Sequence, residues 1–193
     1  EIYLQIQVIL QIQTGRLNHH RMLETHTISK IDVLEGESKL NLEGLSDIIL
    51  GLENFKSFDL AGDTSKCPDL PIINDIINEI SNSFYNTTGL KIQLSKKWCH
   101  IHHKNMSTNV HDHHPDDISS VFYVSTPKGS GNIVFYPNWF THQRYSRGDT
   151  SSFTPEVGKF LIFPGSLDHA VMRNQSDEPR ISLVFNFNIE VNI

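Results

Sequence analysis

Three histidines in two separated segments are the residues of this sequence best suited to metal chemistry. His111 and His113 lie two residues apart in the segment 109–115, and His169 follows an apolar, strand-like run. On an extended strand, residues i and i+2 point to the same face, so His111 and His113 can bind one ion. Imidazole nitrogens suit iron, zinc, copper and nickel. The spacing therefore predicts a metal site that His169 completes.

A cation and a hydroxyl group share one face of the last strand-like run, residues 180–188. The alternation puts four side chains on that face: Arg180, Ser182, Val184 and Asn186. A guanidinium group binds a carboxylate through two parallel hydrogen bonds, so Arg180 and Ser182 together predict a carboxylate site. The alternative for Arg180 is a surface ion pair with a neighbouring carboxylate such as Glu178.

Five separated elements occur in a fixed order along residues 90–190. They are Trp98, the triplet His111-Asp-His113, the run Ser119-Ser-Val-Phe-Tyr-Val124, the apolar run 158–164 with His169, and the triplet Arg180-Ile-Ser182. This order resembles the iron(II)- and 2-oxoglutarate-dependent oxygenase superfamily. The resemblance is to a subgroup that carries Trp, His-x-His and Ser-Gly-x-x-Tyr-Val, and its spacing is more specific than any single motif.

The resemblance implies an enzyme that uses iron(II), with 2-oxoglutarate as co-substrate. The implied metal ligands, which are also the catalytic residues, are His111, His113 and His169. The implied 2-oxoglutarate residues are Arg180, Ser182 and Tyr123, although Tyr123 also suits the core. The implied reaction hydroxylates a C–H bond of a peptidyl side chain or small metabolite with O₂, and it releases succinate and CO₂. Other oxidations use the same architecture, so hydroxylation is only the default expectation.

One position departs from the usual superfamily pattern of two histidines and one carboxylate. His113 stands where an aspartate or glutamate is usual, and Asp112 or Asp116 remains an alternative ligand if the loop bends. His114 competes with His113, but adjacent strand residues point to opposite faces. Two other functions stay open: a cupin-like three-histidine enzyme that does not use 2-oxoglutarate, and a noncatalytic jelly-roll protein that binds a partner or has a structural role.

Several aromatic residues before the motif are interpreted as structural. His100 and His102 share one face of an expected strand. That face could point toward the co-substrate pocket, but we interpret both as structural histidines with satisfied hydrogen bonds. Trp98 is interpreted as a core residue.

The segment 138–154 carries Trp139 and several basic residues, and we expect it to form either a lid or a surface loop.

Length and composition limit the class of protein. A chain of 193 residues suits one domain over 1–193, with an N-terminal strand and supporting helices in 1–89 and a catalytic core in 90–193. A net charge of −6 argues against nucleic-acid or membrane-surface partners. No apolar run approaches the roughly 20 residues that span a bilayer, and the first residues lack a signal-peptide pattern. The oligomeric state is not predicted.

The two cysteines suggest a compartment. With only Cys67 and Cys99, the sequence implies no disulfide framework. A reducing cytoplasm fits this usage best, or the host cytoplasm if the chain is viral.

Hydrophobic periodicity predicts a mainly β protein with N-terminal helices. Alternation predicts a strand over 2–12, and helical spacing predicts a short helix within 42–56 and a longer one from an Asp69 N-cap to Gly89. Short strand-like segments follow at 90–103, 119–126, 131–137, 158–164 and 180–190. Together they predict a double-stranded β-helix, or jelly roll, whose mouth holds the proposed ligands.

Overall fold

The computed structural model describes residues 31–52, 56–57, 62–136 and 150–190. The predicted strand over 2–12 lies outside these residues, as does most of the segment 138–154. The described residues all belong to one compact unit. The interpretation of the whole chain as a single domain therefore stays a prediction.

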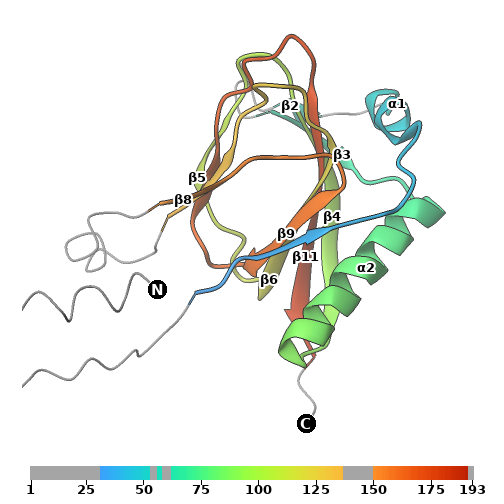
Figure 1. Cartoon of the computed structure of the whole chain (residues 1–193), viewed down its shortest axis with the longest axis vertical. Helices are drawn as coiled ribbons and strands as arrows, with labels where there is room; N and C mark the ends of the chain where they lie inside the picture. The colour runs from blue at the N-terminus through green and yellow to red at the C-terminus, as the bar shows by residue number, and fades with distance from the viewer. Residues whose placement is uncertain (1–30, 53–55, 58–61, 137–149, 191–193) are drawn as a thin grey trace, which may run out of the picture. The chain divides into compact units, whose positions relative to one another are not determined.

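The strands of the described part of the chain form two antiparallel sheets (Figure 1). The larger sheet has seven strands in the order β1 (Leu34–Glu37), β9 (Lys159–Pro164), β6 (Ile118–Ser125), β11 (Arg180–Ile189), β4 (Ile92–His102), β3 (Asp63–Lys66) and β2 (Lys56–Ser57). The smaller sheet has the order β5 (Thr108–His111), β10 (His169–Val171), β7 (Ile133–Phe135) and β8 (Ser151–Phe153). The prediction of a mainly β, double-stranded β-helix fold is confirmed.

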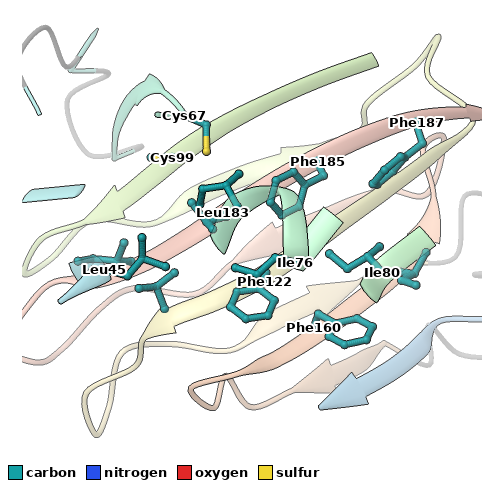
Figure 2. Close-up of a cluster of buried hydrophobic side chains, with 14 of the residues drawn as sticks. Leu45, Cys67, Ile76, Ile80, Cys99, Phe122, Phe160, Leu183, Phe185 and Phe187 are labelled. Carbon is teal, nitrogen blue, oxygen red and sulfur yellow. The ribbon is translucent and has the colours of Figure 1, made fainter. Parts of the chain in front are cut away.

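Strict alternation along the central strands gives the larger sheet two different faces. In β11, Ile181, Leu183 and Phe185 enter the main apolar core, whereas Arg180 and Ser182 on the opposite face line a pocket. Helix α2 (Pro71–Thr88) covers the apolar face (Figure 1). Figure 2 shows the side chains of this core, including Ile76 and Ile80 of α2 beside Phe122 and Phe160 of the sheet. The smaller sheet faces the pocket side of the larger one.

The two helices differ from their predicted boundaries. Helix α2 begins at Pro71, but its N-cap is Leu70. The predicted cap, Asp69, is wrong because the helix starts one residue later and no side chain caps it. The Asp69 carboxylate instead accepts a hydrogen bond from Lys97 Nζ at 2.7 Å. Helix α1 covers only Leu45–Leu50, within the predicted 42–56, because Gly51 caps its end. Glycine is a poor helix residue, which explains the early stop. No helix in the described residues is both long and apolar enough to span a membrane.

Some of the observed strands match the strands predicted from the sequence, and the short ones do not. Five of the predicted segments correspond to β4, β6, β7, β9 and β11, with small shifts at their ends. The short strands β1, β2, β3, β5, β8 and β10 were not predicted. Two of these, β5 and β10, carry residues of the candidate site.

Candidate metal centre and anion pocket

A pocket between the two sheets contains all six residues that the sequence analysis assigned to the metal and 2-oxoglutarate sites. The empty space that it outlines, including the part open to solvent, is about 420 Å³. Its lining includes His111, His113, His169, Arg180, Ser182 and Tyr123. Strands from both sheets contribute, so the fold brings together six assigned residues that lie up to 71 positions apart, from His111 to Ser182.

The three histidines converge at one end of this pocket. His111 ends β5 and His169 begins β10, and the two are paired across the strands. His113 lies beyond β5, where its backbone N–H donates to the Gly165 carbonyl at 2.7 Å. The predicted strand geometry therefore holds for His111 only. Even so, one ring nitrogen from each histidine lies within 4.8 Å of the others.

Backbone hydrogen bonds orient two of the rings. The Nδ1 atoms of His111 and His169 lie 2.8 Å from the carbonyl oxygens of Asn109 and Leu167, respectively. An Nδ1–H that donates to a carbonyl leaves the Nε2 lone pair free for a metal, which is the usual arrangement around ligating histidines. The Nε2 atoms of His113 and His169 are 3.3 Å apart. Two nitrogens about 2.1 Å from a shared ion have a comparable separation.

Burial keeps two of these rings in the neutral form that binds metals. Burial, followed by the nearby His111, lowers the pKa of His113 to about 4. The same two causes lower the pKa of His169 to about 3. Both rings are therefore unprotonated at neutral pH, as a metal ligand must be.

The alternative carboxylate ligands are engaged elsewhere. The buried Asp116 carboxylate accepts hydrogen bonds from Ser95 Oγ, Lys96 Nζ and Asn186 Nδ2 at 2.7–2.9 Å. The exposed Asp112 carboxylate accepts from the backbone N–H of His114 at 3.2 Å. Among the described residues, the one group with metal-binding geometry is His111, His113 and His169. The ligand assignment stays a prediction, and this geometry favours it.

Arg180 is the central residue of the second predicted site, which binds a carboxylate. Its side chain is 1% exposed, and no carboxylate among the described residues contacts it. The guanidinium group donates to the Gly131 carbonyl and to His102 Nδ1, each at 3.2 Å, while Nε is buried without a partner. The alternative ion pair with Glu178 is therefore wrong. A buried cation whose hydrogen-bond acceptors are all neutral creates a strong site for an anion.

Tyr123 adds a second unsatisfied donor to the same wall. Its hydroxyl group is buried without a hydrogen-bond partner, and its ring centroid is 6.0 Å from the Arg180 guanidinium carbon. Burial raises the pKa of Tyr123 to about 12, so the phenol stays protonated. The neighbouring Ser182 is also buried. These groups offer hydrogen-bond donors to one anion.

Three residues of β4, which the sequence predicts to be structural, lie at the pocket or contact Arg180. Trp98 is only half-buried, lines the pocket and lies 5.6 Å from His113 between ring centroids, so its interpretation as a core residue is wrong. His100 lines the same pocket. His102 is fully buried and contacts Arg180; the sequence allowed its face to point toward the co-substrate pocket but did not identify this contact. The available signal was the shared face of residues 98, 100 and 102, but their partner depends on the β4–β11 register.

Asp116 supports the loop that carries His113, and its charge is part of that support. Burial would raise the pKa of Asp116, but hydrogen bonds from Lys96, Ser95 and Asn186 outweigh burial and lower it. We expect Asp116→Asn to lower the free energy of unfolding by about 2 kcal/mol near pH 7. The amide NH₂ of asparagine cannot accept the hydrogen bonds that these three side chains donate, and the negative charge beside Lys96 is lost. Thermal unfolding measured by circular dichroism checks this.

The pH dependence distinguishes a charge effect from a packing effect. A lowered pKa stabilises the folded state above the usual carboxyl pKa of about 3.9, and this contribution is lost as the pH falls through the folded value. The difference between wild type and Asp116→Asn should therefore shrink below about pH 4. Asp177→Asn, which removes an exposed ion pair with Lys104, is the control and should change little. A constant difference from pH 7 to pH 3 would contradict the prediction.

Comparisons with known proteins agree with the geometry. Residues 96–186 match a family described as 2OG-Fe(II) oxygenase, a span that includes all six predicted site residues. A search of curated protein sequences found no match.

Several solved structures share the fold at low sequence identity. The carbocyclase SnoK of nogalamycin biosynthesis, an alpha-ketoglutarate-dependent enzyme, has a TM-score of 0.65 and 11% identity, with 80% of this chain and 78% of SnoK covered. A Pseudomonas putida prolyl-4-hydroxylase has a TM-score of 0.60 and 12% identity, with 81% and 92% covered. A viral collagen prolyl hydroxylase of Paramecium bursaria Chlorella virus-1 has 0.58 and 14%, with 82% and 96% covered. At such identities these likenesses show the fold alone.

Proposed function

We propose that this chain, whose residues 96–186 match the 2OG-Fe(II) oxygenase family, is an oxygenase that hydroxylates a C–H bond of a peptidyl side chain or small metabolite. Its metal is iron(II) and its co-substrate is 2-oxoglutarate. The substrate and the reaction outcome are the parts of this proposal that go beyond the family.

The observation that carries the proposal is the buried Arg180 in the same pocket as a three-histidine group. Its acceptors, His102 Nδ1 and the Gly131 carbonyl, are neutral, and the nearby Tyr123 hydroxyl has no partner among the described residues. A bound anion would therefore compensate the charge of Arg180 and accept hydrogen bonds from the unpaired donors. A dicarboxylate that reaches from Arg180 to the histidines fits both ends of the pocket. The residues present thus fit iron and 2-oxoglutarate.

The proposed roles follow from these positions. His111, His113 and His169 hold iron(II). Arg180, Ser182 and Tyr123 bind the distal carboxylate of 2-oxoglutarate. Iron(II) with 2-oxoglutarate and O₂ supplies the oxidation of a C–H bond, with release of succinate and CO₂.

The chain's other pocket residues contribute by shape. Val121, Val184 and Phe163 line the pocket and present no hydrogen-bonding group. Apolar walls limit water at the site and strengthen the electrostatic contacts that Arg180 makes. Trp98 lies beside His113 and gives the pocket an aromatic wall near the ligands. We place the substrate next to this wall.

The test is an anaerobic titration of purified apoprotein with iron(II) and then 2-oxoglutarate. Chelation of the co-substrate produces a visible charge-transfer absorption, and we expect it to saturate with one equivalent of each. Consumption of 2-oxoglutarate and formation of succinate in air provide the second measurement. Bound iron without the absorption band would reject the proposal and favour the cupin-like or noncatalytic alternative.

The proposed location is the cytoplasm, or the host cytoplasm if the chain is viral. Cys67 and Cys99 are both buried and free, and such neighbouring thiols suit a reducing compartment. The proposed partners are O₂ and a small-molecule or peptidyl substrate, with nucleic acid and membrane disfavoured by the charge of −6.

A further inference from the structure

His102 is the one side chain among the described residues that accepts a hydrogen bond from the Arg180 guanidinium group. Its Nδ1 atom lies 3.2 Å from Arg180 Nη2, and the ring is completely buried. The two residues also face each other directly across strands β4 and β11. This contact is therefore built into the register of the two central strands.

The hydrogen bonds of His102 determine its tautomer. Because a guanidinium group can only donate, Nδ1 of His102 must accept, and the proton of the neutral ring is on Nε2. That Nε2 atom lies 2.7 Å from Thr108 Oγ1, on strand β5 of the other sheet. Thr108 thus anchors the ring from the opposite side of the pocket. Burial, followed by the positive charge of Arg180, lowers the pKa of His102, so the ring stays neutral.

The backbone around His102 is fixed as well. Asn174 is fully buried, and its Nδ2 donates to the carbonyl oxygens of His102 at 2.8 Å and of Glu178 at 2.9 Å. One amide group therefore ties the end of β4 to the segment that precedes Arg180. Ring and backbone are both held, which leaves His102 little freedom to move away from the guanidinium group.

Neutrality is the property that distinguishes His102 from the usual partners of a buried arginine. A carboxylate at this position would satisfy the guanidinium charge and compete with any anionic ligand. Imidazole and the Gly131 carbonyl each accept one hydrogen bond and leave the charge uncompensated. Of the five N–H groups of Arg180, three stay available for a carboxylate.

We propose that His102 is a positioning residue, which orients the Arg180 guanidinium group for the distal carboxylate of 2-oxoglutarate without neutralising it. Thr108 Oγ1 accepts from the Nε2–H of the tautomer that this contact requires, and so holds the ring in place. The inference rests on the proposed function of Arg180 as the co-substrate residue. It adds two residues, His102 and Thr108, that act on binding through Arg180.

The experiment compares three substitutions at His102 by anaerobic 2-oxoglutarate titration of the iron(II)-loaded protein. In His102→Asn, the amide oxygen can take the position of Nδ1, and binding should weaken by less than about 5-fold. His102→Leu removes the acceptor and should weaken binding roughly 10-fold. His102→Asp has the shape of asparagine but pairs with Arg180, and it should weaken binding about 100-fold or more. Iron content should be unchanged in all three variants.

The test is the ranking of the three variants by their affinity for 2-oxoglutarate. Loss of packing alone would give the asparagine and aspartate variants the same affinity, because the two side chains have the same shape. Equal affinity of the Asn and Asp variants, or of Asn and Leu, would overturn the proposal. If the His102 variants do not fold, Thr108→Val replaces them, with an expected weakening of roughly 3- to 10-fold. Unchanged affinity in Thr108→Val would then overturn it. His103→Leu, at the half-exposed neighbour, is the control and should bind like wild type.

Failure of this inference is separable from failure of the proposed function. If Arg180→Met binds 2-oxoglutarate as tightly as wild type, the function assigned to Arg180 is wrong. If Arg180→Met loses binding while the His102 series shows no order, only the positioning role of His102 is wrong.

Discussion

Replacing His169 with alanine is expected to abolish iron retention while leaving the fold largely intact. The side chain is 3% exposed and stacks on the His113 ring at 5.0 Å between centroids. Its Nδ1 atom is held by the Leu167 carbonyl, so the ring has one nitrogen to offer to a metal. Removing one of three ligands should weaken iron binding by more than about 100-fold, since even residues behind the ligands often contribute 10- to 100-fold. Iron content after desalting measures this.

The control is His114→Ala, which removes an exposed histidine beside the same motif. It should retain iron like wild type, because its side chain is not part of the three-histidine group. Circular dichroism should show native secondary structure in both variants. The loss of stability in His169→Ala should be about 1–3 kcal/mol, since a buried ring packed on Phe135 and Phe163 is removed. Wild-type iron content in His169→Ala would remove this residue from the site.

The chemistry of the site was more predictable than the strands that hold it. Alternation along β11 placed Arg180 and Ser182 on one face without knowledge of any neighbour, because a strand has a period of two. Helix α2 was predictable for a similar reason, since Ile73, Ile76 and Ile80 form one continuous apolar stripe. Such periodic patterns are local and need no information about tertiary contacts.

The short strands β5 and β10 could not be predicted in this way. They have four and three residues, too few to establish a period. They exist because each pairs with a neighbour, and that pairing places His111 opposite His169. The backbone hydrogen bond from His113 to Gly165 then brings in the third ring. A Cβ atom at residue 165 would lie 2.0 Å from the Asp116 carbonyl oxygen, so the close approach of the two loops requires glycine.

The role of His102 illustrates the same limit. A histidine on a strand has many uses, and its neighbours in the sequence did not identify this one. The identity of its partner depends on a register across 78 residues, and its neutrality depends on burial next to Arg180. The unpredicted β5 adds the third element, Thr108. Long-range pairing therefore supplied what periodicity could not.

Replacing Arg180 with methionine should separate co-substrate binding from fold stability. Methionine fills a similar volume without charge, and 2-oxoglutarate should bind at least about 100-fold more weakly because a charged, bidentate contact is lost. Stability without ligand should change by no more than about 2 kcal/mol. Removal of a buried, uncompensated cation stabilises the variant, whereas loss of the hydrogen-bond donor to His102 Nδ1 and the Gly131 carbonyl destabilises it. The two effects oppose each other.

Thermal unfolding of the iron(II)-loaded protein, with and without 2-oxoglutarate, measures both effects. At 100 times its Kd, the ligand should stabilise wild type by about 2.7 kcal/mol, or roughly 5–10 °C in Tm for a domain of this size. Arg180→Met should show almost no shift at the same concentration, whereas Arg173→Ala, at an exposed arginine, should shift like wild type. A full ligand-induced shift in Arg180→Met would show that another residue binds the carboxylate. If Arg180→Met instead has a much lower Tm than wild type without ligand, Arg180 is a structural residue. A residue that serves only ligand binding should leave the Tm of the unliganded protein nearly unchanged when an apolar side chain of the same size replaces it.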